Sequence, residues 1–316
     1  MKRDSILILG TGALATLFAA RLAAAGVFVN MLGTWPEGLA ALSEKGAQVE
    51  GGDRAFHVHA TNNPAECKGT RFALVLVKAW QTERAAHQLS GCLAEDGVAL
   101  TLQNGLGNDT VLARALGLPR VARGVTTLGA TLQAPGLVCM GGDGPVSLES
   151  HPRLSPLEEM IHRAGFVVNM ESGFQSLIWG KLVVSSAINP LTALLRVKNG
   201  ELLELPSARA LMGELARETS AVATNLGVTL SFPDPERTVE EVVQLTAGNL
   251  SSMLQDVLRG APTEIDAING AIVRLADEKN LQVPVNRTVS SLVKAIPLHG
   301  MITGTAEMSN LKSRYS

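Results

Sequence analysis

The chain has 316 residues, which is enough for two domains, or one large one, with a sizeable packed core. Hydrophobic residues make up 46% and charged residues 18%, the composition of a compact globular protein rather than a disordered one. The formal net charge is −2 and aromatic residues make up 3%, with no basic run interleaved with aromatics. A nucleic-acid partner or an anionic membrane surface is therefore not expected.

The first half of the chain alternates short apolar runs with helical stretches. Ser5–Leu9 and Val27–Leu32 are expected strands on either side of an Ala-rich helix, Ala13–Ala25. Further strands are expected at Phe72–Val77, Val98–Leu102, Val121–Thr127 and Phe166–Met170, with an inserted strand or hairpin near His57–Ala60. Apolar strands that alternate with helices predict a parallel sheet covered on both faces, that is, a doubly wound α/β domain over residues 1–172.

The second half has a different periodicity. Glu171-Ser172-Gly173 interrupts the pattern, and long helices are expected afterwards at Ala208–Leu226, Val239–Leu258 and Glu264–Lys279. Asn199-Gly200 is interpreted as the end of a helix, with Gly200 in the left-handed conformation. We therefore predict an all-helical C-terminal domain over residues 173–316.

A glycine-rich turn joins the first strand to the first helix. Gly10 permits the tight turn, Gly12 lets the backbone approach a pyrophosphate, and Ala15 is small enough for helix–strand packing. This strand–turn–helix context makes the domain Rossmann-type and predicts dinucleotide binding at the helix N-terminus. The expected cofactor-binding residues of the turn are Gly10, Thr11, Gly12, Ala13, Leu14 and Ala15.

The end of the second strand bears on the choice of cofactor. An acidic residue there would bind the ribose 2′-hydroxyl of NAD, and an arginine would bind the 2′-phosphate of NADP. The segment Asn30–Trp35 contains neither, and Thr34 can donate a hydrogen bond to a phosphate. The prediction is NADPH, with NADH as the alternative.

Two polar segments follow later strands of the sheet. Lys78 comes directly after one strand and Asn104 follows the next. In an open parallel sheet, ligands bind beyond the carboxyl ends of the strands, which makes both residues candidate cofactor or substrate contacts. The alternatives are a solvated loop lysine and an ordinary Asn104-Gly105 turn.

An unusual polar stripe runs through the apolar segment from Trp179 to Leu195. Lys181, Ser185 and Asn189 recur every four residues, so a helix places them on one face, and Pro190 predicts a kink. An unpaired ammonium in apolar surroundings is costly, so Lys181 needs a partner, solvent or a chemical role. The alternative is an amphipathic helix with a solvated edge.

The compartment is predicted from what the chain lacks. The run Ser5–Leu9 is too short for a signal peptide, and Lys181 and Pro190 interrupt the only segment that approaches a membrane span. The three cysteines are widely spaced, which argues against a disulfide framework or a metal site (Cys67, Cys92 and Cys139). We expect a soluble cytoplasmic protein.

Seven ordered motifs carry a resemblance over nearly the whole chain. They are GTGAL (10–14), KAWQ (78–81), LQNGLG (102–107), GVTTLGA (124–130), WGKL…INPLTAL (179–194), NGEL (199–202) and NLSSMLQD…TEID (249–266). With them the chain resembles the ketopantoate reductases. The resemblance implies NADPH-dependent reduction of 2-dehydropantoate to pantoate, on the way to pantothenate and coenzyme A. A small 2-keto acid is the implied partner, and a homodimer is compatible with it.

The resemblance also implies residue roles. Lys181 looks like the general acid, and Glu264 looks like a cofactor contact that also helps to keep Lys181 charged. The other implied cofactor contacts are Thr34, Lys78, Asn104 and Ala130. The implied substrate-binding residues, besides Lys181, are Ser185, Asn189, Asn199, Asn249 and Ser252. From spacing alone, Ser252 and Glu264 have sound structural explanations, as a helical hydroxyl and a first-turn carboxylate.

Three positions depart from the family pattern. Ala15 replaces the third glycine and leaves cofactor binding intact, and Thr34 stands where an arginine is frequent. Ser185 stands where an asparagine usually follows the lysine by four residues, so a paralogue that reduces another 2-keto acid is the closest alternative. A non-catalytic NADP(H)-binding regulator is a third hypothesis, which the joint presence of Lys181, Asn189, Ser252 and Glu264 disfavours.

Overall fold

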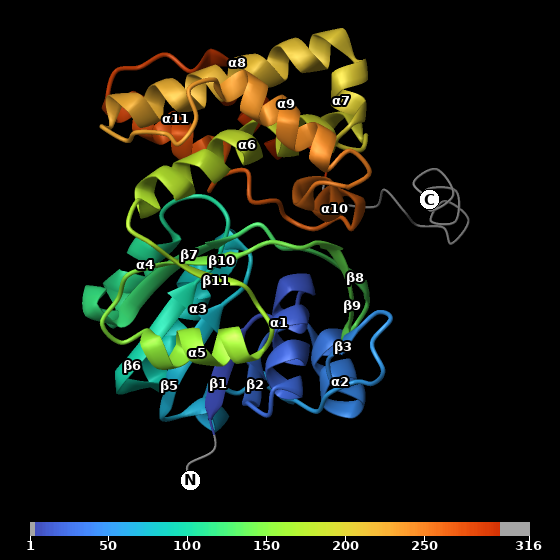
Figure 1. The fold of residues 1–316 in the computed structure, drawn as a ribbon, viewed down its shortest axis with the longest axis vertical. Helices are drawn as coiled ribbons and strands as arrows, with labels where there is room; N and C mark the ends of the chain where they lie inside the picture. The colour runs from blue at the N-terminus through green and yellow to red at the C-terminus, as the bar shows by residue number, and fades with distance from the viewer. Residues whose placement is uncertain (1–3, 298–316) are drawn as a thin grey trace. The chain divides into compact units, whose positions relative to one another are not determined.

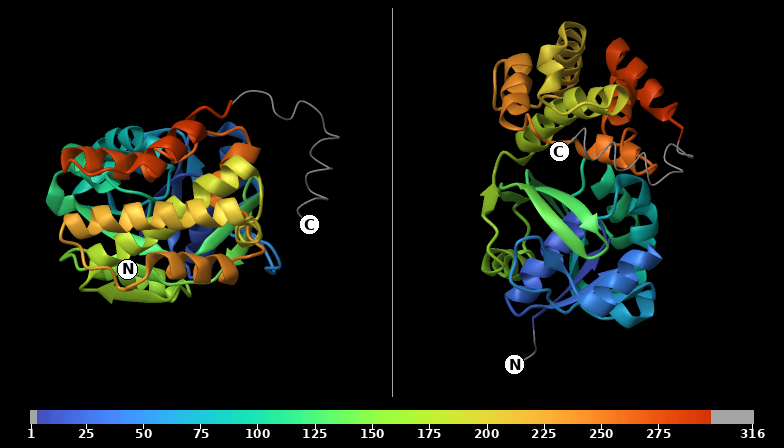
Figure 2. Two further views of the ribbon diagram at one scale, coloured as in Figure 1. Left: turned by 90° about the horizontal axis from the view of Figure 1, so that it is seen from above. Right: turned by 90° about the vertical axis from the view of Figure 1, so that its right-hand side faces the viewer.

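The computed structural model describes residues 4–297 and divides the chain into two compact units, residues 1–174 and a second from Gln175 onward (Figures 1 and 2). Each unit has its own hydrophobic core. Residues 298–316 of the predicted helical domain lie outside the described residues.

The first unit is built on an eight-stranded sheet with the order β11-β10-β7-β6-β5-β1-β2-β4. Its strands are β1 (Ser5–Leu9), β2 (Phe28–Leu32), β4 (His59–Thr61), β5 (Thr70–Val75), β6 (Leu93–Thr101), β7 (Val121–Thr126), β10 (Val146–Glu149) and β11 (Val168–Glu171). The helices of this unit are α1 (Ala13–Ala24), α2 (Pro36–Lys45), α3 (Thr82–Cys92), α4 (Asn108–Leu116) and α5 (Ser155–Arg163).

The central strand β1 shows why the sheet is covered on both faces. Side chains alternate along a strand, and here both sets are buried: Ile6 and Ile8 pack in the core with α1 and α5. Leu7 and Leu9 pack in a second core with α3 and α4. The doubly wound sheet predicted from the continuous apolar runs is confirmed.

The sheet differs from the prediction at its margins. β4 pairs in parallel with β2, so the His57–Ala60 region belongs to the main sheet and is not an insertion. β10 is antiparallel to β7, so the sheet is mixed. A small second sheet, β3 (Gln48–Val49), β8 (Gly129–Ala134) and β9 (Leu137–Gly142), was not predicted. Its β8–β9 hairpin, which faces the viewer in the right-hand view of Figure 2, is rich in glycine and mostly half-exposed, so its apolar pattern is weak.

The second unit is helical, as predicted. It contains α6 (Phe174–Leu195), α7 (Glu201–Glu204), α8 (Pro206–Asn225), α9 (Pro235–Leu245), α10 (Ser252–Leu258), α11 (Asn269–Glu278) and α12 (Pro284–Lys294). Val183 and Ala187 of α6 share a core with Leu215 of α8 and Val239 of α9. Among the described residues, α6 is the one helix long and apolar enough to cross a membrane, but 56% of its apolar window is buried, as in the core helix of a soluble protein.

Three local predictions in this unit were wrong. The predicted helix Val239–Leu258 breaks into α9 and α10, and the turns that begin at Glu264 precede α11, which starts only at Asn269. Gly200 has right-handed helical angles, φ −61° and ψ −32°, and precedes α7. Glycine is needed there for close approach, because a Cβ at position 200 would lie 2.7 Å from the Cβ of Ala247.

Candidate functional site

The glycine-rich turn has the backbone that a pyrophosphate site requires. Gly10 has φ +123°, and a Cβ on it would lie 3.0 Å from the carbonyl oxygen of Leu76, so only glycine is accommodated without strain. Gly12 precedes the first turn of α1 with an ordinary φ of −83°. A Cβ built on Gly12 meets no atom of the described residues within 4 Å, so the helix N-terminus is open to a ligand at this point.

The other residues of the predicted turn are packed beneath it. Thr11 and Ala15 are buried, and Ala13 and Leu14 pack against the core that includes α1. Ala130, at the start of β8, packs against the same core. The first unit therefore brings the predicted contact Ala130 to the same core as the glycine-rich turn.

The segment after β2 lies against this turn. A Cβ on Gly33 would lie 2.6 Å from Cγ2 of Thr11, so the two loops are in close contact. The amide of Gly33 donates to the carbonyl of Thr61 at the end of β4, at 3.1 Å. The next residue, Thr34, is exposed and available to a ligand.

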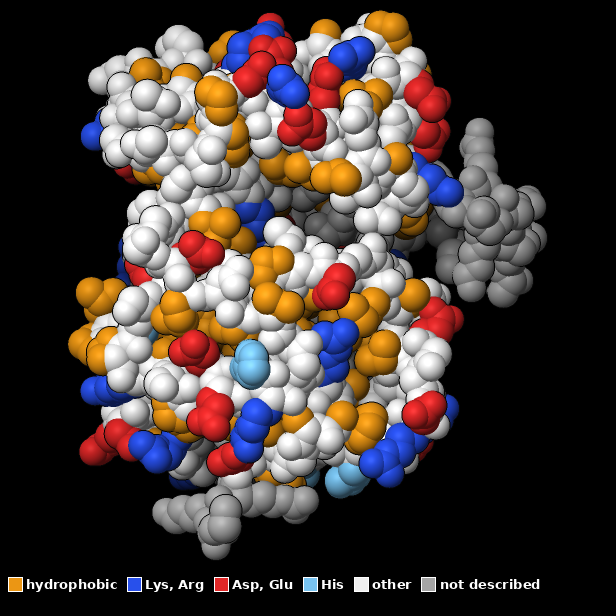
Figure 3. Space-filling view, viewed as in Figure 1, with side chains coloured by type: hydrophobic (Ala, Val, Ile, Leu, Met, Phe, Trp, Pro, Cys, Tyr) orange, Lys and Arg blue, Asp and Glu red, His pale blue; other side chains and the backbone are white. Residues whose placement is uncertain are grey.

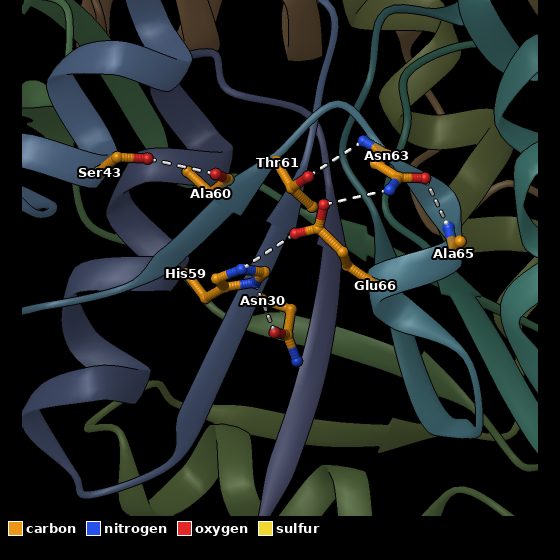
Figure 4. A network of polar contacts seen from close by, with 8 residues as sticks. All are labelled: Asn30, Ser43, His59, Ala60, Thr61, Asn63, Ala65 and Glu66. Carbon is orange, nitrogen blue, oxygen red and sulfur yellow. Dashed lines mark hydrogen bonds and ion pairs between the residues drawn. The ribbon is translucent and has the colours of Figure 1, made fainter.

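A polar network holds β4 and the following turn beside β2 (Figure 4). The His59 imidazole lies between two partners, with Nδ1 3.1 Å from Oδ1 of Asn30 and Nε2 3.2 Å from a carboxylate oxygen of Glu66. Asn63 donates its side-chain amide to Glu66 at 3.1 Å and its backbone amide to Thr61 at 3.0 Å. These contacts fix the strand whose end supports Gly33.

The loops that carry Lys78 and Asn104 are held together by side chains that the sequence reasoning missed. The Gln103 amide donates to the carbonyl of Val77 at 2.9 Å and to Oγ1 of Thr82 at 2.8 Å. The Asn108 amide donates to the carbonyl of Asn104 at 2.9 Å, while its oxygen accepts from Thr82. Both loops thus form one rigid edge at the carboxyl ends of β5 and β6. Polar residues directly after two apolar strands were the only signal for this role.

Helix α6 carries the polar stripe in the second unit. The helix is continuous from Phe174 to Leu195, so Lys181, Ser185 and Asn189 lie on one face as predicted, each half-buried. Burial lowers the pKa of Lys181 to about 8, and the negative charge of Glu264 opposes this fall. Glu264 is itself 5% exposed, so the structure couples a buried carboxylate to the lysine.

Asn199 offers an acceptor that the described protein does not use. Asn199 is 7% exposed, and its side-chain nitrogen donates to Oγ1 of Thr246 at 3.0 Å. Its Oδ1 is buried and has no hydrogen-bond partner among the described residues. A ligand hydroxyl would satisfy this oxygen, which is otherwise costly to leave unpaired.

The segment 249–252 is tied to helix α6. Its Asn249 carbonyl accepts from the backbone amide of Asn199 at 3.1 Å. The Ser251 hydroxyl caps α10 by accepting from the amide of Leu254 at 3.0 Å and accepts from Oγ1 of Thr192 at 2.7 Å. Asn249 is exposed and Ser252 half-buried at the first turn of α10. Sequence reasoning missed the contact between Thr192 and Ser251, because both residues look like ordinary helix residues in the pattern.

The fold and these residues define the class of protein: an α/β protein with a Rossmann-type unit and a helical unit that carries a lysine of lowered pKa. Residues 6–153 match the model of the family described as Ketopantoate reductase PanE/ApbA, and residues 173–297 match its C-terminal model. The chain belongs to the ketopantoate reductase family.

Individual relatives agree with this assignment. The chain is 37% identical to the 2-dehydropantoate 2-reductase of Archaeoglobus fulgidus, over 94% of this chain and 99% of the relative. A solved structure of a PanE/ApbA family ketopantoate reductase from Ralstonia eutropha JMP134 superposes with a TM-score of 0.86 at 30% identity, covering 92% of this chain and 98% of the other. D-mandelate dehydrogenase, solved with NADH and anilino(oxo)acetate, shares the fold with a TM-score of 0.85 at 24% identity, covering 98% and 99% of the two chains.

Proposed function

We propose that this protein is a 2-dehydropantoate 2-reductase that uses NADPH and Lys181 as general acid. The observation that carries the proposal is the pairing of Lys181, whose pKa burial lowers to about 8, with the buried carboxylate of Glu264. A lysine with a pKa near the working pH is suited to give up a proton. The chain's likeness to curated 2-dehydropantoate 2-reductases over nearly its whole length supports the substrate.

The predicted Rossmann-type domain, residues 1–172, is proposed to bind the cofactor. Gly10 to Ala15 would hold the pyrophosphate, since the turn leaves open space above Gly12 at the N-terminus of α1. Lys78 and Asn104 lie in the two loops at the carboxyl ends of β5 and β6. The remaining proposed contacts are Thr34 and Ala130, together with Glu264 of the helical unit. When bound, the reduced nicotinamide supplies a hydride to the keto carbon.

The predicted helical domain, residues 173–316, is proposed to hold the keto acid and the acid catalyst. As the carbonyl carbon receives hydride, its oxygen gains negative charge, and Nζ of Lys181 donates a proton to that oxygen. The product is the 2-hydroxy acid, and the neutral amine regains its proton from water. Glu264 keeps Lys181 protonated before the step, because its charge raises the pKa of the lysine.

The remaining polar groups are proposed to orient the substrate. Oδ1 of Asn199 would accept a hydrogen bond from a substrate hydroxyl, because it is buried without a partner among the described residues. Asn189 and Ser185 stand on the face of α6 that carries Lys181, and Asn249 and Ser252 would receive the carboxylate and hydroxyl ends.

The preference for NADPH over NADH is part of the proposal. The loop after β2 carries no carboxylate that would repel a 2′-phosphate, and Thr34 is exposed beside Gly33. Glu66, in the turn after β4, is engaged with His59 and Asn63. A cytoplasmic location and a homodimer stay predictions, which fractionation and sedimentation would check.

One observation favours a second candidate, a paralogous reductase of another 2-keto acid. Ser185 is half-buried on the face of α6 that carries Lys181, and it is shorter than the asparagine of the family pattern, so a substrate pocket on this face would gain room. A pocket with added room discriminates weakly against larger apolar groups.

Initial rates of NADPH and NADH oxidation, measured with 2-dehydropantoate and a panel of branched and bulky 2-keto acids, test these candidates together. The highest kcat/KM with 2-dehydropantoate and NADPH supports the proposal. A higher value with another keto acid favours the paralogue. Cofactor binding without turnover on any member of the panel favours the regulator.

A further inference from the structure

The proline in α6 leaves one main-chain carbonyl without its helical donor. In an α-helix the carbonyl of residue i accepts from the amide of residue i+4, and proline has no amide hydrogen. Pro190 lies inside α6, so the carbonyl of Ser186 loses its usual partner. Ser186 is 0% exposed, so water does not replace that partner at the surface, and an unpaired buried carbonyl would be costly.

A side chain from another helix supplies the missing donor. The side-chain amide of Asn269, at the start of α11, donates to the carbonyl oxygen of Ser186 at 2.9 Å. The same nitrogen donates its other hydrogen to Oδ1 of Asn286 in α12, at 3.0 Å. Asn269 is completely buried, and its own Oδ1 has no partner among the described residues. Both hydrogens of this amide are thus used, and its position depends on these two bonds.

A carboxylate at one end of this series of hydrogen bonds fixes which atom of each side-chain amide donates and which accepts. Glu218 of α8 accepts from the side-chain nitrogen of Asn286 at 2.9 Å and from the backbone amides of Val285 and Asn286 at 2.9 and 2.8 Å. Because a carboxylate only accepts, the Asn286 nitrogen must face Glu218 and the Asn286 oxygen must face Asn269. The Asn269 nitrogen then has to face Ser186. The series Glu218–Asn286–Asn269–Ser186 therefore has one orientation.

We propose that Asn269 is a positioning residue. It replaces the main-chain donor removed at Pro190 and so fixes the positions of Lys181 and Asn189 relative to each other on α6. Ser186 lies between these two residues, and Pro190 directly follows Asn189. Without the Asn269 amide, the carbonyl of Ser186 would have to turn to find another donor. That turn would change the path of the helix between Lys181, the proposed acid, and Asn189, the proposed substrate ligand. The inference rests on the proposed roles of Lys181 and Asn189 for its effect on the rate, but not for its effect on the helix.

The test restores the lost donor in the main chain. Asn269→Leu removes the side-chain amide at similar volume, and Pro190→Ala returns an amide hydrogen to the helix. We expect Asn269→Leu to lower kcat/KM for the keto acid about 10- to 100-fold while the Kd for NADPH stays unchanged. The double variant Pro190→Ala/Asn269→Leu should recover most of that loss, because the amide at position 190 can then donate to Ser186.

A matched control separates positioning from stability. Thr219→Val removes the contact between Oγ1 of Thr219 and Oγ of Ser186, 2.9 Å, in the same buried network but leaves the carbonyl paired. It should lower Tm and leave kcat/KM within about twofold. If Pro190→Ala fails to rescue Asn269→Leu, or if Thr219→Val lowers kcat/KM as strongly as Asn269→Leu, the proposal is wrong.

A second readout is independent of the reaction. Hydrogen exchange of the peptide that spans residues 181–195 should accelerate in Asn269→Leu, and in the smaller Asn269→Ser if the leucine variant does not fold, and return toward the native rate with Pro190→Ala. Unchanged exchange in the asparagine variants overturns the inference. Loss of the proposed function would appear instead as an absence of turnover in the unmodified protein, so the two failures are distinguishable.

Discussion

The carboxylate of Glu264 opposes the fall in the pKa of Lys181 that burial produces, and the balance leaves that pKa at about 8. Both residues belong to the helical unit, Lys181 on α6 and Glu264 in the turns before α11. Without Glu264, burial would lower the pKa further and leave more of the lysine neutral at a given pH. A neutral amine does not supply the proton that a developing alkoxide needs. The proposed function of the pair is to keep an acidic proton on Lys181 at neutral pH.

The pH dependence of kcat/KM tests this balance. The protonated, active form of Lys181 is fully present below a pKa of about 8 and is lost as the pH rises through it, so the rate should fall on the alkaline side. Glu264→Gln removes the charge that raises the pKa, so the alkaline limb should move to lower pH. Asp266→Asn is the control, since this exposed carboxylate pairs with Lys294 at the surface. An alkaline limb that stays in place in Glu264→Gln would contradict the coupling.

Substitutions of the two glycines in the turn, Gly10 and Gly12, should have different effects, one on stability and the other on cofactor binding. Gly10→Ala forces a Cβ against the carbonyl of Leu76 at φ +123°, so we expect a loss of about 1–3 kcal/mol in the free energy of unfolding. Gly12→Ala meets no described atom within 4 Å and has an ordinary φ, so its Tm should stay near the native value. Its Kd for NADPH should nevertheless rise by about tenfold or more, because the methyl group fills the space of the pyrophosphate. Equal effects of both variants on Tm would refute this distinction.

The sheet and the glycine turn could be predicted from the sequence because they have strong local signals. Strand β1 is apolar on both faces and leads directly into Gly10, and the spacing of Lys181, Ser185 and Asn189 matches the pitch of α6. The motifs of the resemblance also supplied roles for Asn199 and Glu264, which spacing alone did not assign.

The errors fall where tertiary contacts decide the local structure. Gly200 was interpreted as a left-handed helix end, but close contact with Ala247 explains the glycine, and the left-handed residue after α6 is Arg196. The break between α9 and α10 depends on bonds from Asn199 and Gly200 to residues 246–249, which no periodicity reveals. Gln103 and Asn269 are likewise recognisable only once their distant partners are known.

The cofactor preference should respond to charge at position 34. Thr34→Asp places a carboxylate beside the expected 2′-phosphate, so kcat/KM with NADPH should fall by about tenfold or more while the value with NADH holds or rises. Thr34→Asn, which is of similar size and uncharged, should change the ratio of the two values by less than about threefold. A ratio that is the same in Thr34→Asp and the native protein would exclude this residue from cofactor selection.

The substrate range should respond to position 185. Ser185→Asn adds an amide on the face of α6 between Lys181 and Asn189, so it should narrow the pocket. We expect kcat/KM for bulky 2-keto acids to fall by about 10-fold relative to that for 2-dehydropantoate. Ser176→Asn, one turn before Gly180 on the same helix and half-buried, is the comparison variant and should leave the ratio unchanged. Parallel changes for all substrates would show that Ser185 does not set selectivity.

The most direct measurement is the steady-state rate of NADPH oxidation by Lys181→Ala with 2-dehydropantoate. We expect kcat/KM to fall by about 10²- to 10⁴-fold, because the developing alkoxide loses its proton donor, while NADPH still binds. Lys279→Ala, which removes an exposed lysine after α11, should retain the native rate. A native rate in Lys181→Ala would show that this lysine is not the acid.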